Sequence, residues 1–309
     1  MRDHAGAATV EPHPYPGGAA LVRGDEGWVL LEDGAPGGLG GALAWADGRG
    51  VDALHVLTGA KAGRLARRAA LLDPEPTVWQ IVGRTLIRAA PEPRPNANPL
   101  PPAVSALRRV IEEAGADAVE EFGGLTGEVA GLEVCRAAVD DGGIARLEVG
   151  IGVHDREAFR LLHGEGAPGP ALRDVVAQVA PHRRPGAPPH ALNRLARERA
   201  LRARLVADPP LIGLSVLTPA PPPVPRANLA DPVPCVAMGI ADDGEPVVVV
   251  CSTGIDLDLV PFAADARDAL ARPGTGLILA VPEGDDHPVT RRLAGRLAAP
   301  AAVVTVPAA

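Results

Sequence analysis

A chain of 309 residues, 47% of them apolar, is long enough for two or three domains with buried cores and too apolar to be disordered. Its net charge of −8 argues against a protein that coats nucleic acid over its whole surface, and 2% aromatic residues are too few for a single-strand-binding surface built on base stacking. Lys61 is the only lysine, and the absence of Gly-Lys-Ser/Thr excludes a P-loop nucleotide hydrolase.

No feature of the chain predicts export or membrane insertion. The first residues lack the apolar segment of a secretory signal, and no apolar run approaches the roughly 20 residues that span a bilayer. The three cysteines, Cys135, Cys235 and Cys251, fall in predicted strands and form no C-x-x-C pair. We therefore expect a cytoplasmic protein, without membrane contact, whose thiols are buried and reduced.

The first folded segment follows a proline-containing arm. Residues 1–16 are expected to be a flexible arm, and residues 17–90 a first α/β unit. Apolar spacing and turn signals predict strands at 19–23 and 28–32, a glycine-rich helix at 39–48, a strand at 53–58, a helix at 62–72 and a strand at 77–82. This is a hairpin that leads into β-α-β-α-β, and right-handed crossovers would place its strands side by side in a mainly parallel sheet.

Two proline-rich segments divide the rest of the chain. Residues 91–102 and 209–233 are expected to be linkers, because their prolines favour an extended backbone. Residues 103–208, between them, are a middle α+β region. Its predicted elements are a helix at 103–114, strands at 132–139 and 144–152 around the turn Asp140-Asp141-Gly142-Gly143, and a helix that starts at His154.

The end of the chain repeats the pattern of its beginning. Residues 234–309 are predicted to form a last α/β unit, with strands at 235–240, 247–251, 277–281 and 302–306 and helices at 259–270 and 289–297. Both units are hairpins followed by β-α-β-α-β with similar spacing, which suggests an internal duplication. The predicted fold class is therefore α/β, with mixed and mainly parallel sheets.

A basic helix is predicted at about 191–205. Residues 182–204 contain seven arginines and one acidic residue, Glu198. Because arginine suits bidentate contact with phosphate, Arg194, Arg197 and Arg202 are candidates for contact with phosphate or with a partner. Leucines and alanines fall on two sides of this helix. The arginines are therefore expected to pair with acidic residues of the same chain or of another subunit.

Acidic residues lie on the predicted middle hairpin. Glu133 stands in Gly-Leu-Glu-Val and Glu148 in Leu-Glu-Val-Gly, with Glu128 just upstream. The order hairpin, helix, strand with these acids resembles the core of the restriction-endonuclease-like PD-(D/E)xK superfamily. The resemblance implies that Glu128, Glu133 and Glu148 hold Mg²⁺ or Mn²⁺, which activates water for phosphodiester hydrolysis.

The chain departs from that superfamily at one important position. The residue two places after Glu148, where the superfamily has lysine, is Gly150, and the first and last units do not carry the acid pair. The alternative interpretation is that Glu133 and Glu148 line a solvated face of a hairpin, since alternation along a strand often turns an acid outward.

A second group of candidate ligands follows strands of the last unit. In an open α/β sheet, ligands bind beyond the carboxyl ends of strands. The loop residues expected there, around a metal or a cationic ligand, are Asp256, Asp258, Asp285, Asp286 and His287. The alternative is helix capping, by Asp258 and by Asp286 or His287. Lys61, in a strand-to-helix loop, is a further candidate for anion binding.

These residues do not form a complete catalytic constellation. We therefore expect a non-catalytic scaffold, or a protein that binds a ligand or partner, with another protein or a second copy as its partner. The alternative is a metal-dependent nuclease-like phosphodiester hydrolase, or a degenerate descendant of one, with Glu133 and Glu148 as catalytic metal ligands. Nucleic acid is the less favoured partner.

Overall fold

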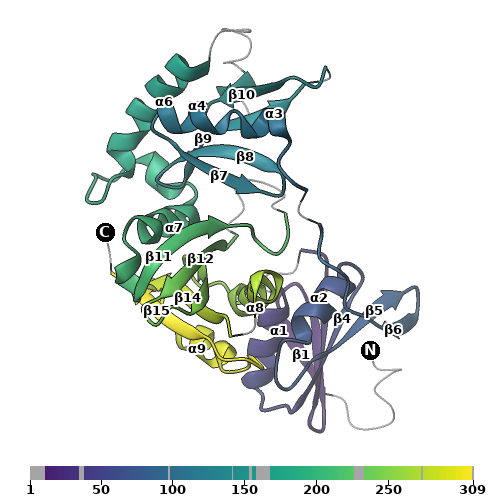
Figure 1. The fold of residues 1–309 in the computed structure, drawn as a ribbon. Coiled ribbons are helices and arrows are strands. Elements are labelled where there is room, and N and C mark those ends of the chain that lie inside the picture. Colours follow the sequence, from purple (N-terminus) through teal and green to yellow (C-terminus); the bar gives the residue numbers. More distant parts are fainter. Residues whose placement is uncertain are drawn as a thin grey trace. The chain divides into compact units, whose positions relative to one another are not determined.

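The computed structural model describes residues 11–34, 38–96, 98–140, 142–152, 155–157, 168–225, 233–272 and 274–307 (Figure 1). Within these ranges the chain forms helices and three β-sheets, which confirms the predicted α/β class. None of the helices in these ranges has the length and apolar character that crossing a membrane requires.

The chain divides into two compact units, and each is described by itself. The first comprises Met1–Arg94 and Gly254–Thr305, and the second comprises Pro95–Thr253 and Val306–Ala309. The boundary after residue 94 lies in the predicted linker 91–102. The boundary after residue 253 lies inside the predicted last unit 234–309, so that the hairpin of this stretch and its helices belong to different compact units.

A six-stranded sheet forms the first part of the first unit. Its strands, in the order in which they lie in the sheet, are β1 (Glu11–Tyr15), β2 (Gly18–Arg23), β3 (Glu26–Leu31), β4 (Ala53–Thr58), β5 (Thr77–Val82) and β6 (Thr85–Arg88). The pairs β3–β4 and β4–β5 are parallel, and the others are antiparallel. Helices α1 (Gly38–Asp47) and α2 (Ala62–Ala69) are the crossovers between the parallel strands.

Strand β1 corrects the prediction that residues 1–16 are a flexible arm. Residues 11–15 pair with β2 along their whole length, whereas residues 1–10 lie outside the described part of the chain. Pro12 and Pro14 argue against a strand in the sequence. Because β1 is the edge strand of its sheet, a missing N–H group can face outward without breaking the ladder.

The rest of the first unit comes from the end of the chain. It contains α8 (Leu259–Leu270), β14 (Gly276–Pro282), the 3₁₀ helix η3 (Glu283–Asp285), α9 (Pro288–Ala294) and β15 (Ala302–Val306). Helix α8 packs against α1 and α2, and Asp265 of α8 is fully buried where it meets Arg67 of α2. An antiparallel bridge joins Leu72 to Leu297, just after α2 and α9 respectively. These contacts hold residues 254–305 to the N-terminal segment.

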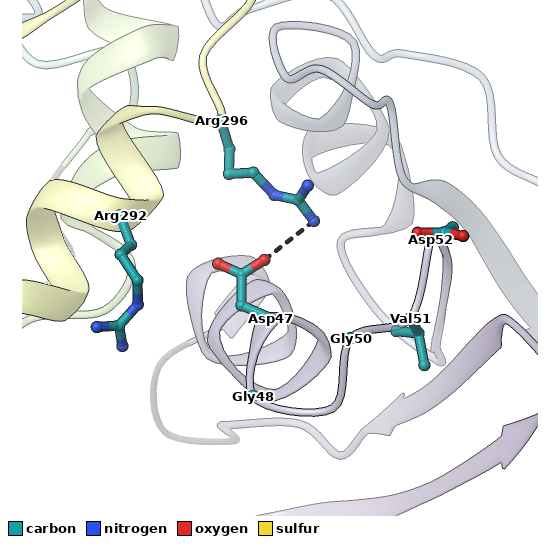
Figure 2. A pocket seen from close by; sticks show the side chains of 7 residues that line it. All are labelled: Asp47, Gly48, Gly50, Val51, Asp52, Arg292 and Arg296. Atoms are coloured by element: carbon teal, nitrogen blue, oxygen red, sulfur yellow. Dashed lines mark ion pairs between the residues drawn. The ribbon is translucent and has the colours of Figure 1, made fainter.

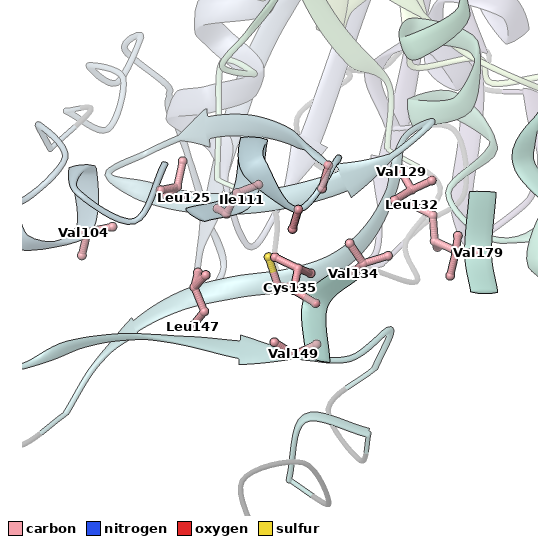
Figure 3. Close-up of a cluster of buried hydrophobic side chains, with 13 residues drawn as sticks. Val104, Ile111, Leu125, Val129, Leu132, Val134, Cys135, Leu147, Val149 and Val179 are labelled. Carbon is pink, nitrogen blue, oxygen red and sulfur yellow. The ribbon is translucent and has the colours of Figure 1, made fainter. Parts of the chain in front are cut away.

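A four-stranded antiparallel sheet forms the first part of the second unit. Its strands follow in the order β10 (Ala145–Val149), β9 (Leu132–Val139), β8 (Gly124–Val129) and β7 (Asp117–Glu121). One face packs against α4 (Arg108–Glu113) and α6 (Pro168–Arg183). The core on this face includes Ile111, Leu125, Val134 and Leu147 (Figure 3).

Two predictions for the middle region need correction. The predicted helix 103–114 is two shorter helices, α3 (Pro102–Ser105) and α4. The hairpin β7–β8 is absent from the predicted elements, because Gly123, Gly124 and Gly127 interrupt the alternation that marks a strand. Of the helix predicted to start at His154, residues 155–157 are helical, and residues 153–154 and 158–167 lie outside the described ranges.

Helical turns and a second group of strands complete the second unit. They are η1 (Ala191–Arg194), α7 (Arg197–Ala207), η2 (Pro209–Ile212), β11 (Leu214–Ala220), β12 (Cys235–Ala241) and β13 (Pro246–Cys251). Strands β11, β12 and β13 pair antiparallel in sequence order. The predicted linker 209–233 is therefore wrong for η2 and β11, and its residues 226–232 lie outside the described chain. The predicted helix 191–205 is divided into η1 and α7.

Along the chain, the elements from β12 to β15 occur in the order strand, strand, helix, strand, helix, strand, apart from the short turn η3. The elements from β2 to β5 follow the same order. That a duplication produced this likeness remains a prediction.

Candidate functional site

The acids that resemble a nuclease metal site lie on the hairpin β8–β9. Glu128 of β8 faces Glu133 of β9 directly across the ladder. The register shifts beside this pair, because Gly127 is opposite Cys135, so that Val134 is an extra residue on β9. This bulge brings Glu133 to the same face as Arg136, which alternation alone would not do.

The turn of this hairpin is shaped for close contact with α7. Gly131 has a φ of +80°, and a Cβ atom built on it would lie 2.3 Å from the carbonyl carbon and oxygen of Arg199. Only glycine fits both the left-handed backbone and this approach. The turn therefore brings α7 against the polar face of the sheet, where its arginines meet the two glutamates.

Glu128 is buried and held by two arginines of α7. Its side chain is 3% exposed, Arg199 Nη1 donates to Glu128 Oε1 at 2.6 Å, and Arg202 Nη2 donates to Oε2 at 3.2 Å. Arg202 is itself 1% exposed and donates from Nη1 to Glu121 Oε1 at 3.0 Å. Burial by itself lowers the pKa of Arg202, but the charges of Glu128 and Glu121 outweigh it and raise that pKa.

Glu133 is buried to the same extent and also faces arginines. Arg136 donates from Nε and Nη2 to the two carboxylate oxygens at 3.0 and 3.1 Å, and Arg156 Nη1 donates to Oε1 at 3.1 Å. The hydrogen bond to Glu133 is the main cause that raises the pKa of Arg136. We call the seven residues of this network the Glu–Arg cluster: Glu121, Glu128, Glu133, Arg136, Arg156, Arg199 and Arg202.

The third predicted metal ligand is placed differently. Glu148 of β10 is opposite Arg136 in the register and is half-buried, and its charge contributes to the raised pKa of Arg136. Gly150, where the nuclease superfamily has lysine, has a φ of +141°. Among the residues that the structure describes, no three His, Cys, Asp or Glu side chains are grouped so that they could hold a metal ion. Glu128 and Glu133 are thus brought together. Arg202 lies between Glu128 and Glu121, and Arg136 pairs with Glu133 and faces Glu148.

The candidate ligands of the last stretch take part in turns and caps of the first unit. Asp258 does not cap α8 with its side chain. Instead it accepts hydrogen bonds from the Gly40 amide of α1 at 3.2 Å and from Arg68 Nη1 at 2.6 Å. Asp256 Oδ1 accepts from the Asp258 amide, and Asp285 Oδ2 accepts from the Gly254 amide.

The other two residues of that group are also engaged locally. His287 Nδ1 accepts from the Val289 amide and caps α9, as the capping alternative predicts. Asp286 is paired with Arg291, at 2.9 Å between Oδ2 and Nη2. Lys61 is exposed at the start of α2, with a φ of 59° and no side-chain cap. Asp256, Asp286 and His287 therefore stabilise local turns and a helix start, whereas Asp258 and Asp285 hold their loops to other segments of the chain. Among the described residues, no three of these side chains are grouped so that they could hold a metal ion.

The predicted contact arginines separate into two groups. Arg202 lies inside the Glu–Arg cluster, as the prediction of pairing within the chain requires, whereas Arg194 and Arg197 are exposed. Glu121, Arg136, Arg156 and Arg199 of the cluster were not among the candidate residues. Arg199 and Arg202 are three residues apart and therefore share one helix face. This spacing is the sequence signal that could have indicated a shared acidic partner.

A surface hollow of the first unit holds none of these candidate residues. It has a volume of about 550 Å³ and is lined by Asp47, Gly48, Gly50, Val51, Asp52, Arg292 and Arg296 (Figure 2). Arg296 Nη2 lies 3.0 Å from Asp47 Oδ1 across it. Its two arginines and two aspartates balance in charge, so the hollow favours neither an anion nor a cation.

No family model, no curated protein and no solved structure matches this chain.

Proposed function

We propose that this is a non-catalytic α/β protein that binds an acidic protein partner through a basic surface of its second unit. The surface is formed by the end of α6, by η1 and by the start of α7. Its exposed residues are Arg184, His190, Arg194, Leu195 and Arg197. The Glu–Arg cluster, on this proposal, fixes α7 and the preceding loop to the sheet and carries out no chemistry.

The observation that carries the proposal is the neutralisation of Glu128 and Glu133. Each is 3% exposed and accepts hydrogen bonds from two arginines. A divalent metal would have to displace those guanidinium groups and lie among like charges. Removing one member of a buried ion pair typically costs about 3–5 kcal/mol, so the arrangement opposes metal entry.

Hydrogen bonds hold in place the segment from the end of α6 to the start of α7, which exposes the other arginines. Arg183 is half-buried and donates to the carbonyl oxygens of Leu192, Leu195 and Ala130, which ties η1 to α6 and to the β8–β9 turn. His190 Nδ1 accepts from the Leu192 amide and caps η1. No acidic residue occurs from position 175 to position 197. The exposed arginines are therefore held in a basic surface that suits carboxylates.

An apolar side chain in the middle of this surface favours a protein partner over a polyanion. Leu195 is 45% exposed between Arg194 and Arg197. Nucleic-acid surfaces without sequence preference rely on charge and on aromatic stacking, and this surface has no Phe, Tyr or Trp among the residues that form it. A partner segment with acidic side chains around an apolar one matches both features.

Binding of an acidic peptide tests the proposal. The probe is a fluorescein-labelled polyglutamate with one leucine at its centre, measured by anisotropy against the full chain at rising NaCl. We expect salt-sensitive binding that Arg184→Glu/Arg194→Glu weakens at least tenfold. The control Arg84→Glu/Arg88→Glu changes net charge equally at exposed positions of the first unit and should leave binding unchanged. Equal weakening by both variants, or no binding, would remove the proposal.

A metal-dependent nuclease is the second candidate, favoured by the direct apposition of Glu128 and Glu133. Calorimetric titration with Mn²⁺ and nicking of supercoiled DNA distinguish the two. A Mn²⁺-dependent nicking activity that Glu148→Ala abolishes would replace the binding proposal. We expect no heat of Mn²⁺ binding and no nicking of the DNA.

A further inference from the structure

Two of the three cysteines face each other across one strand pair. Cys235, the first residue of β12, is directly opposite Cys251, the last residue of β13. Neither cysteine is part of a disulfide, and both side chains are fully buried. Facing residues of an antiparallel pair have Cα atoms about 4.5 or 5.5 Å apart, and disulfides span Cα separations of about 4.4–6.8 Å. The register therefore gives the pair a Cα separation that a disulfide can span.

The residue on the facing strand distinguishes this pair from the third cysteine. Burial raises the pKa of the Cys251 thiol, while the charge of Arg202 on α7 opposes this rise. Arg202 is itself fixed by Glu121 and Glu128. Burial raises the pKa of the Cys135 thiol as well, to about 12, and the charge of Arg156 is among the effects that oppose this rise. Cys135 lies in the apolar core of the β7–β10 sheet, against Gly127. It faces Gly127 in the register and has no cysteine opposite, which makes it an internal control.

The pair lies at the end of its ladder and not in the middle. Because Cys235 begins β12 and Cys251 ends β13, the last pair of the ladder can separate while the rest of the sheet stays formed. Such local opening exposes both thiols to solvent and removes the burial that raises the pKa of Cys251. A reagent can then reach them without unfolding of the second unit.

The geometry points to a thiol–disulfide site: we propose that Cys235 and Cys251 form a reversible intramolecular disulfide with small disulfide oxidants such as glutathione disulfide. One cysteine thiolate attacks a sulfur of the oxidant, forms a mixed disulfide and releases one glutathione. The facing thiolate then attacks the cysteine sulfur of that mixed disulfide and releases the second glutathione. Two protein thiols lose two protons and two electrons, and the oxidant takes up both electrons.

The experiment uses the full chain in glutathione buffers of increasing disulfide fraction, at a urea concentration below the unfolding transition. Circular dichroism verifies that the chain stays folded. Acid quenching, denaturation, alkylation with iodoacetamide and intact mass then count the thiols. We expect the alkylated thiols to fall from three to one, with the loss of two hydrogen atoms and no retained glutathione. Peptide mapping should find Cys135 alkylated, and dithiothreitol should restore all three thiols.

Variants separate this pair from chance oxidation. The variant Cys135→Ala should still form the disulfide. In Cys235→Ala and in Cys251→Ala, the remaining cysteine of the pair should stay a thiol or form a mixed disulfide with glutathione. Three alkylated thiols at every buffer ratio would overturn the inference, and so would a disulfide that includes Cys135 or joins two chains. The wild-type thiol count decides the matter even if a variant does not fold.

Discussion

Arg202 Nη2 lies 3.2 Å from Glu128 Oε2, and the two side chains are 1% and 3% exposed. The pair joins helix α7 to the polar face of the β7–β10 sheet, and Arg199 and Glu121 extend it on either side. A buried carboxylate is expensive unless it is paired, so the two residues depend on each other. The acid that was expected to bind a metal thus holds helix α7 to the sheet.

Loss of Arg202 should destabilise the second unit strongly. Arg202→Met keeps the length of the side chain but leaves Glu128 short of one partner, and we expect the free energy of unfolding to fall by about 3 kcal/mol. Urea denaturation followed by circular dichroism measures this. Arg194→Met, an exposed change on the same segment, should stay within about 0.5 kcal/mol of the wild type. Similar losses for both variants would show that the buried pair carries no special weight.

Gly131 should tolerate alanine much less well than Gly143. Both glycines have a φ of +80°, so alanine meets the same backbone strain of about 1–2 kcal/mol at each. A Cβ on Gly131 would also lie 2.3 Å from the Arg199 carbonyl group, whereas nothing lies within 4 Å at Gly143. We expect Gly131→Ala to cost about 2 kcal/mol more than Gly143→Ala in urea denaturation. Equal costs would contradict the close approach of α7 to this turn.

Asp265 should control the acid stability of the first unit. It is fully buried, and burial alone raises its pKa, but the hydrogen bond from Arg67 and the charges of Arg68, Arg67 and Arg94 lower it below its usual value. A carboxyl with a lowered folded pKa stabilises the protein above its unfolded pKa of about 4. This stabilisation disappears as the pH falls through the folded pKa.

The corresponding variant is Asp265→Asn. It should destabilise the protein by about 3–5 kcal/mol at pH 7 and flatten the dependence of stability on pH below about 4. Thermal unfolding at a series of pH values measures both effects. Asp268→Asn on the same helix is the control, because Asp268 is 51% exposed. If the stability of Asp265→Asn still fell steeply below about pH 4, other carboxyl groups would be responsible for the acid dependence.

His55 should make stability fall on mild acidification. The ring stacks on Trp28 at 4.0 Å, and Nδ1 accepts a hydrogen bond from Trp79 Nε1 at 3.2 Å. Burial is the main cause that lowers the pKa of His55 below 6.5. The unfolded chain therefore binds more protons than the folded chain below about pH 6.5, and stability declines there until the folded pKa is passed.

Replacement by phenylalanine should remove this slope. In His55→Phe, the slope of the free energy of unfolding against pH, between about pH 7 and pH 5, should be smaller than in the wild type. The difference in slope should be at most about 1.4 kcal/mol per pH unit. The lost acceptor for Trp79 should cost about 1 kcal/mol at pH 8. Tryptophan fluorescence during urea denaturation reports both effects, because two of the three tryptophans lie at the site. An unchanged slope would show that another group titrates.

The successes and errors of the sequence predictions have common physical causes. The helix at 259–270 and the hairpin around Asp140–Gly143 were predicted correctly, since apolar spacing and turn residues act locally. The strands β1 and β11 were both missed because they contain prolines. Each is the edge strand of its sheet, where proline is tolerated, and position in a sheet is not visible in the sequence.

The candidate site was only half visible for a related reason. Glu128 and Glu133 stood out as acids on a hairpin, but the partners of Glu128 follow it by 71 and 74 residues. The bulge at Val134 and the left-handed Gly131 decide which charges meet, and neither raises a signal in composition or periodicity. The arginines of the predicted helix were expected to pair with acids of the same chain or of another subunit; Arg199 and Arg202 pair within the chain, with glutamates that the sequence did not single out as their partners.

The amino-acid sequence by itself determined the α/β class and most of the individual strands and helices, because hydrophobic periodicity and turn chemistry depend on neighbouring residues. Tertiary structure alone decided the exposure of the acids, the residues that neutralise them and the way in which residues 254–305 join the N-terminal segment. Those outcomes depend on charges brought together over long distances, such as Arg67 and Asp265, which are 198 residues apart. The free energy of a charge is set by what surrounds it after folding, and a linear pattern does not contain that information.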